Sequence, residues 1–245
     1  MSIWVGVALL ASVFLTSTLS GIFGMAGGLI LLAVLLLILP VGTAIAVQGA
    51  IQVIANGSRA WLSRAFIDWR VLSIMTAGLL VAAILLFILR YQPDLATVCI
   101  TIGLLPILLW IPQSWLALDA SKPLHAFAGG FLAGGINLAI GVAGPTMDMF
   151  FIRTEMDRRT IIATKAAAQV INHLAKVLFY WNATLVLTGW EWGAVALAAP
   201  FAVLGTSAGY WVLQRLSDAN FKAWTRLLVT AIGIYYLIRG MSLLI

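Results

Sequence analysis

An almost uninterrupted apolar run extends from Ile3 to Leu39, and the glycine-rich stretch Gly21–Gly28 breaks it. A helix that crosses a membrane needs about 20 apolar residues. The run is therefore long for one crossing and short for two crossings joined by a loop. Glycine inside such a run breaks a helix and lets backbone or a ligand come close. The run predicts two helical limbs separated by the glycines.

A second apolar region, 123–152, has the same property. It contains the break Gly141–Pro145 and is followed by a charged cluster that begins at Arg153. Each of these charges would cost about 2.5–3.5 kcal/mol or more in hydrocarbon. Residues 145–152 make only about 12 Å of helix, so they cannot cross a bilayer alone. We therefore expect 123–152 to enter the membrane and return as a hairpin, with the break as its buried tip.

Composition extends this interpretation to the whole chain. Of the 245 residues, 63% are hydrophobic and 9% are charged, whereas soluble domains carry about 25% charged residues. We predict an all-α integral membrane protein that forms a single transmembrane domain, 1–245. The one cysteine, Cys99, excludes an internal disulfide and a cysteine-based metal cluster, and neither metal nor cofactor is expected. Six further stretches are candidates for crossings: 43–58, 71–89, 95–112, 160–181, 193–213 and 222–244.

Basic residues indicate how these helices are oriented. If four loops are cytoplasmic (59–70, 119–122, 153–159 and 215–226), ten Lys and Arg residues lie inside and only Arg90 and Arg239 lie outside. This asymmetry satisfies the positive-inside rule and does not suggest a nucleic-acid partner. Each half is then a broken, re-entrant helical hairpin followed by three transmembrane helices, and because three is odd the second half is inverted. A parallel four-plus-four arrangement is the alternative, although it would bury the 153–159 charges.

The two halves also resemble each other in sequence. When residues 11–60 are shifted by 117 positions without a gap, thirteen of the fifty positions are identical. Glutamine is rare in this chain, so the match of Gln52-Val-Ile to Gln169-Val-Ile is hard to ascribe to apolar composition. After a six-residue insertion, Ile67-Asp68-Trp69 resembles Trp190-Glu191-Trp192. We therefore predict two inverted-topology repeats, 1–117 and 118–245.

A glycine-rich break, a following helix and an Ile-Asp-Trp start of the next helix, each present twice, resemble the sulfite exporter TauE/SafE family over essentially the whole chain. The family's GxxGxGGG-type breaks are represented by Gly21-x-x-Gly24-x-x-Gly27-Gly28 and Gly141-x-x-Gly144-Pro145. Ala26 and Ala143 stand where a further glycine is usual, and Lys165 stands where a small or hydroxyl residue is common. The resemblance implies a multi-pass protein of the bacterial inner membrane that exports sulfite or small organosulfur anions such as sulfoacetate.

Both breaks favour anion binding. A helix that begins at Gly27-Gly28 or at Gly144-Pro145 directs unpaired N–H groups toward its own start. The helix dipole adds about half a positive charge there. Two such helix starts near the membrane middle would hold an anion without a basic side chain. The alternative is that the glycines only permit close helix packing.

Polar side chains on the helix after each hairpin complete the candidate site. Gln52, Asn56 and Arg59 share a helix face, and Gln169, His173 and Lys176 repeat their spacing. Amides can donate to an oxyanion without a charge. Arg59 is expected at the inner interface, where it would snorkel as a surface residue. The alternatives are interhelical hydrogen bonding for the amides and snorkelling for Lys176. The predicted substrate-binding residues are Gly24, Gly27, Gly28, Gln52, Asn56, Gly141, Gly144, Thr146, Gln169, Asn172, His173 and Lys176.

Three residues are candidates for proton coupling: Asp148, His173 and Lys165. Asp148 is the acidic residue expected inside the membrane, in the first turn of the returning helix. There it would complement the helix dipole and pair with Lys165, or it would carry a proton. A packed, hydrogen-bonded His173 is the alternative to a proton-carrying one.

These features favour a secondary transporter of small sulfur-containing anions, and an anion channel is the alternative. No P-loop is recognisable, so coupling would come from an ion gradient. An intramembrane enzyme is less well supported, because His125 and His173 belong to neither an HExxH nor a Gly-x-Ser-x-Gly motif. No catalytic residue is predicted. The expected partners are the anionic substrate and the lipid bilayer, and a homodimer is left open.

Overall fold

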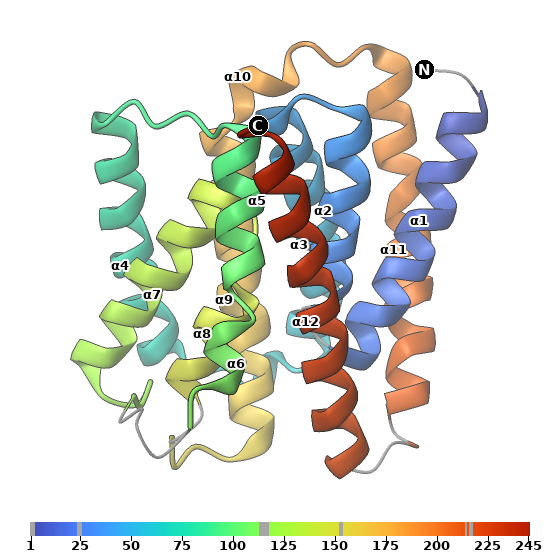
Figure 1. Cartoon of the computed structure of the whole chain (residues 1–245). Coiled ribbons are helices and arrows are strands. Elements are labelled where there is room, and N and C mark those ends of the chain that lie inside the picture. Colours follow the sequence, from blue (N-terminus) through green and yellow to red (C-terminus); the bar gives the residue numbers. More distant parts are fainter. Residues whose placement is uncertain (1–2, 24–25, 113–117, 152–153, 214, 216–217) are drawn as a thin grey trace.

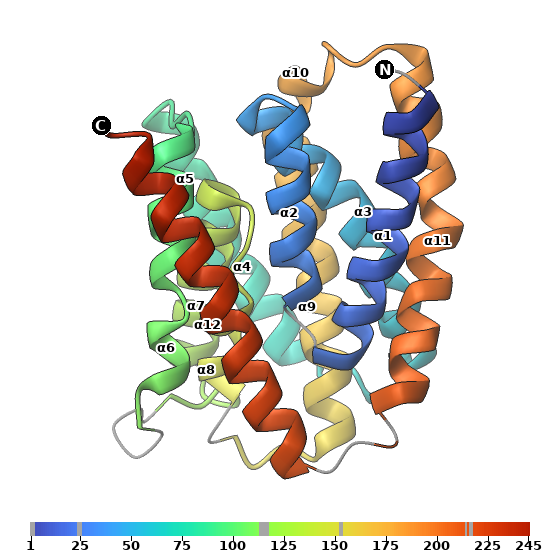
Figure 2. The same cartoon turned by 45° about the vertical axis from the view of Figure 1, so that its right-hand side comes forward.

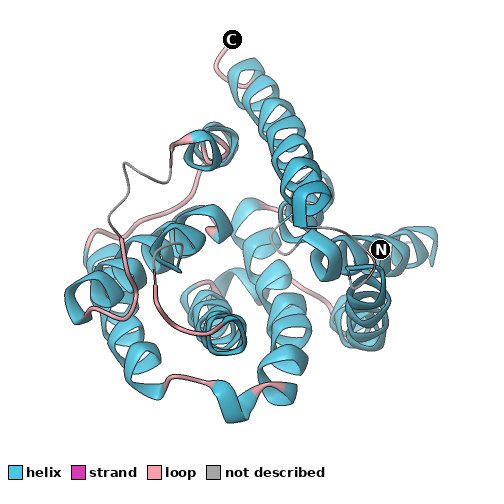
Figure 3. Cartoon of the chain, turned by 90° about the horizontal axis from the view of Figure 1, so that it is seen from below, coloured by secondary structure: helices cyan, strands magenta, loops and turns pink. Residues whose placement is uncertain are grey.

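The computed structural model describes residues 3–23, 26–112, 118–151, 154–213, 215 and 218–245, and all regular structure in these ranges is helical (Figures 1 and 3). In the first half the helices are α1 (Ile3–Phe23), α2 (Ala26–Ile38), α3 (Val41–Leu62), the 3₁₀ turn η1 (Arg64–Phe66), α4 (Trp69–Ile88), α5 (Leu95–Leu104) and α6 (Ile107–Trp110). In the second half they are α7 (Pro123–Ile140), α8 (Gly144–Phe151), α9 (Arg158–Phe179), α10 (Trp181–Thr184), α11 (Gly189–Leu213) and α12 (Asp218–Ser242).

The predicted all-helical class is confirmed, and helices occupy all six predicted stretches. One stretch differs in detail, because 95–112 is two helices rather than one. Pro106 separates α5 from α6, since proline has no N–H to donate and its ring crowds the preceding turn. The chain continues there through tighter i→i+3 bonds, with Leu108 N donating to Leu105 O at 3.0 Å.

Both long apolar regions fold as hairpins with unequal limbs. Helix α1 begins and α2 ends on the upper side of Figures 1 and 2, whereas α7 begins and α8 ends on the lower side. The backbone N–H of Ala120 donates to Phe150 O at 2.7 Å, so the segment before α7 and the end of α8 are neighbours. Residues 123–151 therefore start and end on the same side of the bundle, and residues 141–143 at the tip are buried.

Among the described residues, four helices are long and apolar enough to cross a membrane by length and composition: Gly6–Phe23, Trp69–Ile88, Pro123–Ile140 and Trp192–Leu213. Helices α3 and α9 are equally long, at 22 residues each, but they carry the polar side chains. These two helices pack against each other. Two helices that carry polar side chains on their facing sides are thus paired inside the bundle, where intramembrane polar groups find partners.

Close-packed helix pairs surround α3 and α9. Helix α1 packs on α11, and α4 packs on α7. Glycine makes both contacts possible, because a Cβ on Gly209 would overlap Thr18 O of α1 and one on Gly130 would overlap Met75 O of α4. Helices α5 and α12 form the remaining major pair. Small residues let the backbones approach in this way in membrane bundles.

Aspartate side chains start three helices. Asp68 accepts from two N–H groups of α4, Asp157 accepts from two of α9, and Asp94 accepts from one of α5. The Thr160 hydroxyl also donates to Asp157, and this hydrogen bonding lowers the pKa of the Asp157 carboxyl. The N–H of Asp68 donates to the Thr164 hydroxyl at 2.9 Å and so fixes the start of α4 against α9. These caps satisfy N–H groups that a helix start leaves unpaired.

Candidate functional site

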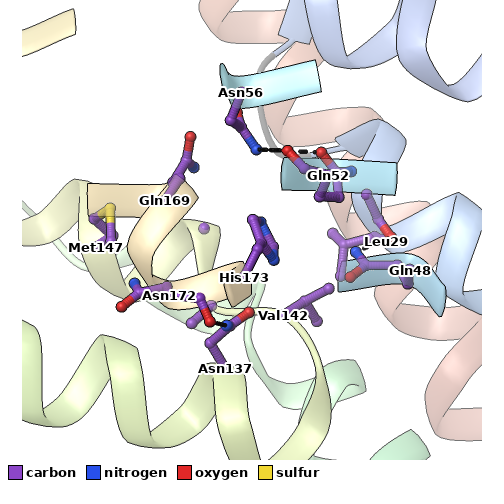
Figure 4. A pocket seen from close by; sticks show the side chains of 13 residues that line it. Leu29, Gln48, Gln52, Asn56, Asn137, Val142, Met147, Gln169, Asn172 and His173 are labelled. Carbon is purple, nitrogen blue, oxygen red and sulfur yellow. Dashed lines mark hydrogen bonds between the residues drawn. The ribbon is translucent and has the colours of Figure 1, made fainter. Parts of the chain in front are cut away.

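A cavity of about 50 Å³, lined mostly by buried residues, lies where the two glycine breaks meet α3 and α9 (Figure 4). A cavity needs about 10–15 Å³ to hold one water, so this cavity has room for a few waters or one small anion. Its lining comes from both halves of the chain: Gly28, Leu29, Gln48, Gln52, Asn56, Asn137, Val142, Ala143, Gly144, Met147, Gln169, Asn172 and His173.

Most of the predicted site residues lie at this cavity. Seven of them line it: Gly28, Gln52, Asn56, Gly144, Gln169, Asn172 and His173. Four others, Gly27, Gly141, Thr146 and Lys176, are outside the lining, and Gly24 lies outside the described residues. The polar faces of α3 and α9 therefore meet around one space.

Two adjacent glycines of the first break have different surroundings. A Cβ on Gly27 would overlap the backbone oxygen of Thr16, so Gly27 permits close packing of α2 on α1. A Cβ on Gly28 would lie 2.8 Å from Gln52 Nε2 and 3.3 Å from Gln48 Nε2. Gly28 therefore leaves space for the two amides beside it.

The second break is fixed at Gly141. This residue ends α7 with a φ of 89°, a left-handed conformation that strains any residue with a side chain. Helix α8 begins three residues later, at Gly144, as predicted. The turn leaves the last carbonyls of α7 needing donors from other parts of the chain.

Donors from outside α7 supply these bonds. The Tyr180 hydroxyl donates to Leu138 O at 2.8 Å, and the Tyr91 hydroxyl donates to Ala139 O at 3.1 Å. Lys176 Nζ donates to Gly141 O at 2.7 Å. A cation at a helix C-terminus is favourable because it opposes the negative end of the dipole. The end of α7 is thereby held in place by side chains from α9 and from the segments after α4 and α9.

Lys176 also joins the two breaks. Its side chain has 0% exposure, which excludes snorkelling to an interface. Besides Gly141 O, Lys176 Nζ donates to Gln48 Oε1, and Gln48 Nε2 donates to Gly28 O at 3.2 Å. One hydrogen-bonded network therefore runs from the second break through α9 and α3 to the first break.

Arg59 is also turned inward, contrary to the expectation that it snorkels at the interface. Its Nη2 donates to Asn56 Oδ1 at 3.2 Å, and its Nε is buried without a hydrogen-bond partner among the described residues. Asn56 Nδ2 in turn donates to Gln52 Oε1 at 3.3 Å and to Gln52 O at 3.0 Å. Arg59 is thus connected to the cavity through two amides of α3.

His173 lies between α9 and α3 in Figure 4 and points into the space between them. The side chain is 8% exposed, and its Nδ1 has no hydrogen-bond partner within the described ranges. A buried polar atom without a partner costs free energy unless a water or ligand supplies one. The hydroxyl of Thr146 in α8 is buried in the same unsatisfied state, again counting only the described residues.

Asp148 and Lys165 form the ion pair expected from the sequence. Their side chains are 32% and 26% exposed, and neither lines the cavity. The expected place of Asp148 in the helix was wrong. Helix α8 starts at Gly144, so Asp148 begins its second turn and not its first.

No lining residue in the described part of the chain carries a fixed charge. Two cations outside the lining are hydrogen-bonded to lining amides: Lys176 donates to Gln48, and Arg59 donates to Asn56. The cavity therefore presents neutral donors backed by positive charge, which suits an anion. The described residues contain no group of three or more His, Cys, Asp or Glu side chains able to hold a metal.

Sequence reasoning missed two lining amides, Gln48 and Asn137. Asn137 Nδ2 donates to Asn172 O at 3.1 Å and connects α7 to α9. When the two halves are aligned with a shift of 117 positions, Gln48 matches Lys165 and Asn137 matches Ser20. Neither amide has an amide at the equivalent position, so comparing the two halves could not reveal them. For Gln48 a signal was present, since it lies four residues before Gln52 on the same helix face.

The model of one protein family, described as Sulfite exporter TauE/SafE, matches residues 9–236. The matched range includes both glycine breaks and every residue that lines the cavity. No curated protein and no solved structure matches the chain.

Proposed function

The chain belongs to the sulfite exporter TauE/SafE family, and from that premise we propose that the cavity between its two glycine breaks holds a sulfur oxyanion during transport. Membership makes the chain a multi-pass membrane exporter of the sulfite and anion class, within a family of transporters and not of enzymes. The finer proposal is a secondary transporter of sulfite or a small organosulfonate in the bacterial inner membrane.

One observation carries this proposal. The cavity lies at both breaks and is lined by amides and a histidine, while Arg59 and Lys176, which are outside the lining, donate to two of these amides. Neutral N–H donors in a space of low dielectric are strong partners for oxyanion oxygens. His173 Nδ1 lacks a partner among the described residues, and in the tautomer that carries the proton on Nδ1 it would donate to a bound anion.

The packing of the helices supports the proposed inverted repeats. The sequence repeat pairs α1 with α7, α3 with α9, α4 with α11, and α5 with α12. Exchanging these partners turns the α1–α11 contact into the α7–α4 contact and leaves the α3–α9 and α5–α12 contacts unchanged. The two hairpins also open in opposite directions (Figure 2). Such an arrangement suits alternating access around a central site.

Replacing Gln52 or Gln169 with alanine is expected to reduce sulfite transport in liposomes by about tenfold or more, because each change removes a donor to a charged ligand. Both side chains line the cavity, one from each half. Arg90→Ala is the control, because Arg90 is exposed at the end of α4. Wild-type rates in both glutamine variants would contradict the proposed site.

Replacing Asp148 with asparagine tests the proton-coupling role. If this carboxylate carries the coupling proton, Asp148→Asn is expected to abolish uptake driven by a pH gradient while sulfite exchange continues. If the carboxylate serves only its ion pair with Lys165, the variant keeps the pH-gradient response and loses only stability. Gradient-driven flux and exchange, measured on the same liposomes, separate the two roles.

Counterflow distinguishes the proposed carrier from an anion channel. Liposomes loaded with unlabelled sulfite are expected to accumulate labelled sulfite transiently, because a carrier exchanges one substrate molecule for another. Flux without accumulation would favour a channel.

A further inference from the structure

We propose that Arg59 is a positioning residue: through Asn56 it fixes the amide of Gln52 so that its nitrogen, and not its oxygen, faces the cavity. This inference rests on the proposed function, because it explains how the same cavity distinguishes an anion from a cation or from water.

The direction of the hydrogen bonds follows from the chemistry of arginine. A guanidinium can only donate. Arg59 Nη2 lies 3.2 Å from Asn56 Oδ1, so the oxygen of the Asn56 amide must face Arg59. The nitrogen of that amide then faces Gln52. It donates to Gln52 Oε1 at 3.3 Å, so the oxygen of the next amide is also taken.

The remaining end of Gln52 is its Nε2. The side chain is 7% exposed and lines the cavity. Nε2 lies 2.8 Å from the point where Gly28 would carry a Cβ, which places this end of the amide beside the first break. A buried, oriented donor at a cavity is complementary to an anionic oxygen.

The equivalent position in the second half follows the same logic. Lys176, which is 117 residues after Arg59, is also a donor-only side chain. It donates to Gln48 Oε1, which directs Gln48 Nε2 toward Gly28 O. A cation from each half, itself outside the lining, therefore determines which end of a lining amide of α3 is presented to the first break.

A double-mutant cycle between Arg59 and Gln52 tests the inference. Binding of radiolabelled sulfite is measured on the purified full chain for the wild type, R59M, Q52A and the double variant. We expect Q52A and R59M each to weaken binding by about tenfold, and the double variant to bind no more weakly than R59M alone. The reason is that without Arg59 the Gln52 amide can rotate, so little remains for Q52A to remove.

Two further variants separate positioning from general structural damage. R59K keeps a donor-only side chain and is expected to retain most of the sulfite affinity, although lysine packs differently. Arg70→Met removes an exposed cation at the start of α4 and is expected to bind as the wild type does. A structural role alone would lower the unfolding temperature of R59M but leave the effect of Q52A intact.

The outcomes distinguish this inference from the proposed function. If the wild type binds sulfite and Q52A weakens binding, but Q52A costs the same factor in the R59M background, the positioning role is overturned and the site stands. Loss of affinity in R59K equal to that in R59M would also overturn it. If the wild type binds no sulfite, the proposed function fails, and the positioning role fails with it.

Discussion

Replacing Gly28 with alanine is expected to weaken sulfite binding about ten- to hundredfold, the cost of one lost hydrogen bond to a charged group, while the fold stays intact. The added methyl group would lie 2.8 Å from Gln52 Nε2 and 3.3 Å from Gln48 Nε2. Both atoms are the ends of flexible side chains, so they can move aside without disturbing a helix. The methyl group would then occupy part of a cavity of only about 50 Å³.

Two other glycines provide matched controls for the same substitution. Gly27→Ala would press a methyl group against the backbone of Thr16, which cannot move aside, so it is expected to lower the unfolding temperature. Gly57 lies in α3, and nothing lies within 4 Å of the position that its Cβ would take, so Gly57→Ala is expected to leave binding unchanged. In a helix interior alanine is favoured over glycine by about 1 kcal/mol, so this control should not be less stable.

Thermal unfolding and sulfite binding on the same samples check this prediction. Gly28→Val, with a larger side chain, is expected to bind no measurable sulfite. Wild-type affinity in Gly28→Ala would show that the anion does not occupy the space beside Gly28. An equal loss of stability at Gly27 and Gly28 would show that both glycines act through packing.

Much of the architecture could be predicted from the sequence because hydrocarbon restricts the choices so strongly. The charges that begin at Arg153 predicted that residues 123–152 return to the side on which they start. The hydrogen bond between Ala120 and Phe150 agrees with this prediction, because it holds the start of α7 beside the end of α8. The equivalent positions of Gln52 and Gln169 identified both as cavity residues, because helical periodicity places them on the polar faces of α3 and α9.

The parts that could not be predicted depend on contacts between distant segments. Gly27 and Gly28 are adjacent and chemically identical, yet one packs on α1 and the other adjoins the cavity. A lysine in an apolar helix is ordinarily expected to snorkel. Lys176 does not, because the left-handed turn at Gly141 leaves a carbonyl that needs a donor 35 residues away.

The second large effect is expected at Lys176, where a substitution should abolish transport and yet change the stability of the fold little. Lys176→Met removes the ammonium that donates to Gly141 O and Gln48 Oε1, so the two breaks lose their connection and sulfite transport should be abolished. The two acceptors left unpaired cost about 1–3 kcal/mol each. Against this, the variant no longer buries a charge, whose desolvation costs several kcal/mol. The unfolding temperature should therefore change little.

Removing the partner instead of the cation is expected to lower the stability of the fold. Gln48→Leu leaves the fully buried Lys176 ammonium without one of its two acceptors. A hydrogen bond to a charged group contributes about 1.5–3 kcal/mol, which lowers the unfolding temperature of a chain of this size by about 3–12 °C. Adding Lys176→Met to Gln48→Leu should recover part of that loss, because the unsatisfied charge disappears, while transport stays absent.

Differential thermal unfolding of the two single variants and the double variant checks the argument. Lys122→Met is the matched control, because Lys122 is exposed before α7 and makes no side-chain cap bond. A double variant less stable than Gln48→Leu would mean that Lys176 stabilises the fold through contacts other than Gln48. Normal transport in Lys176→Met would mean that the two breaks function without the network, and the anion site would then have to be held together by the helix contacts of α3 and α9 alone.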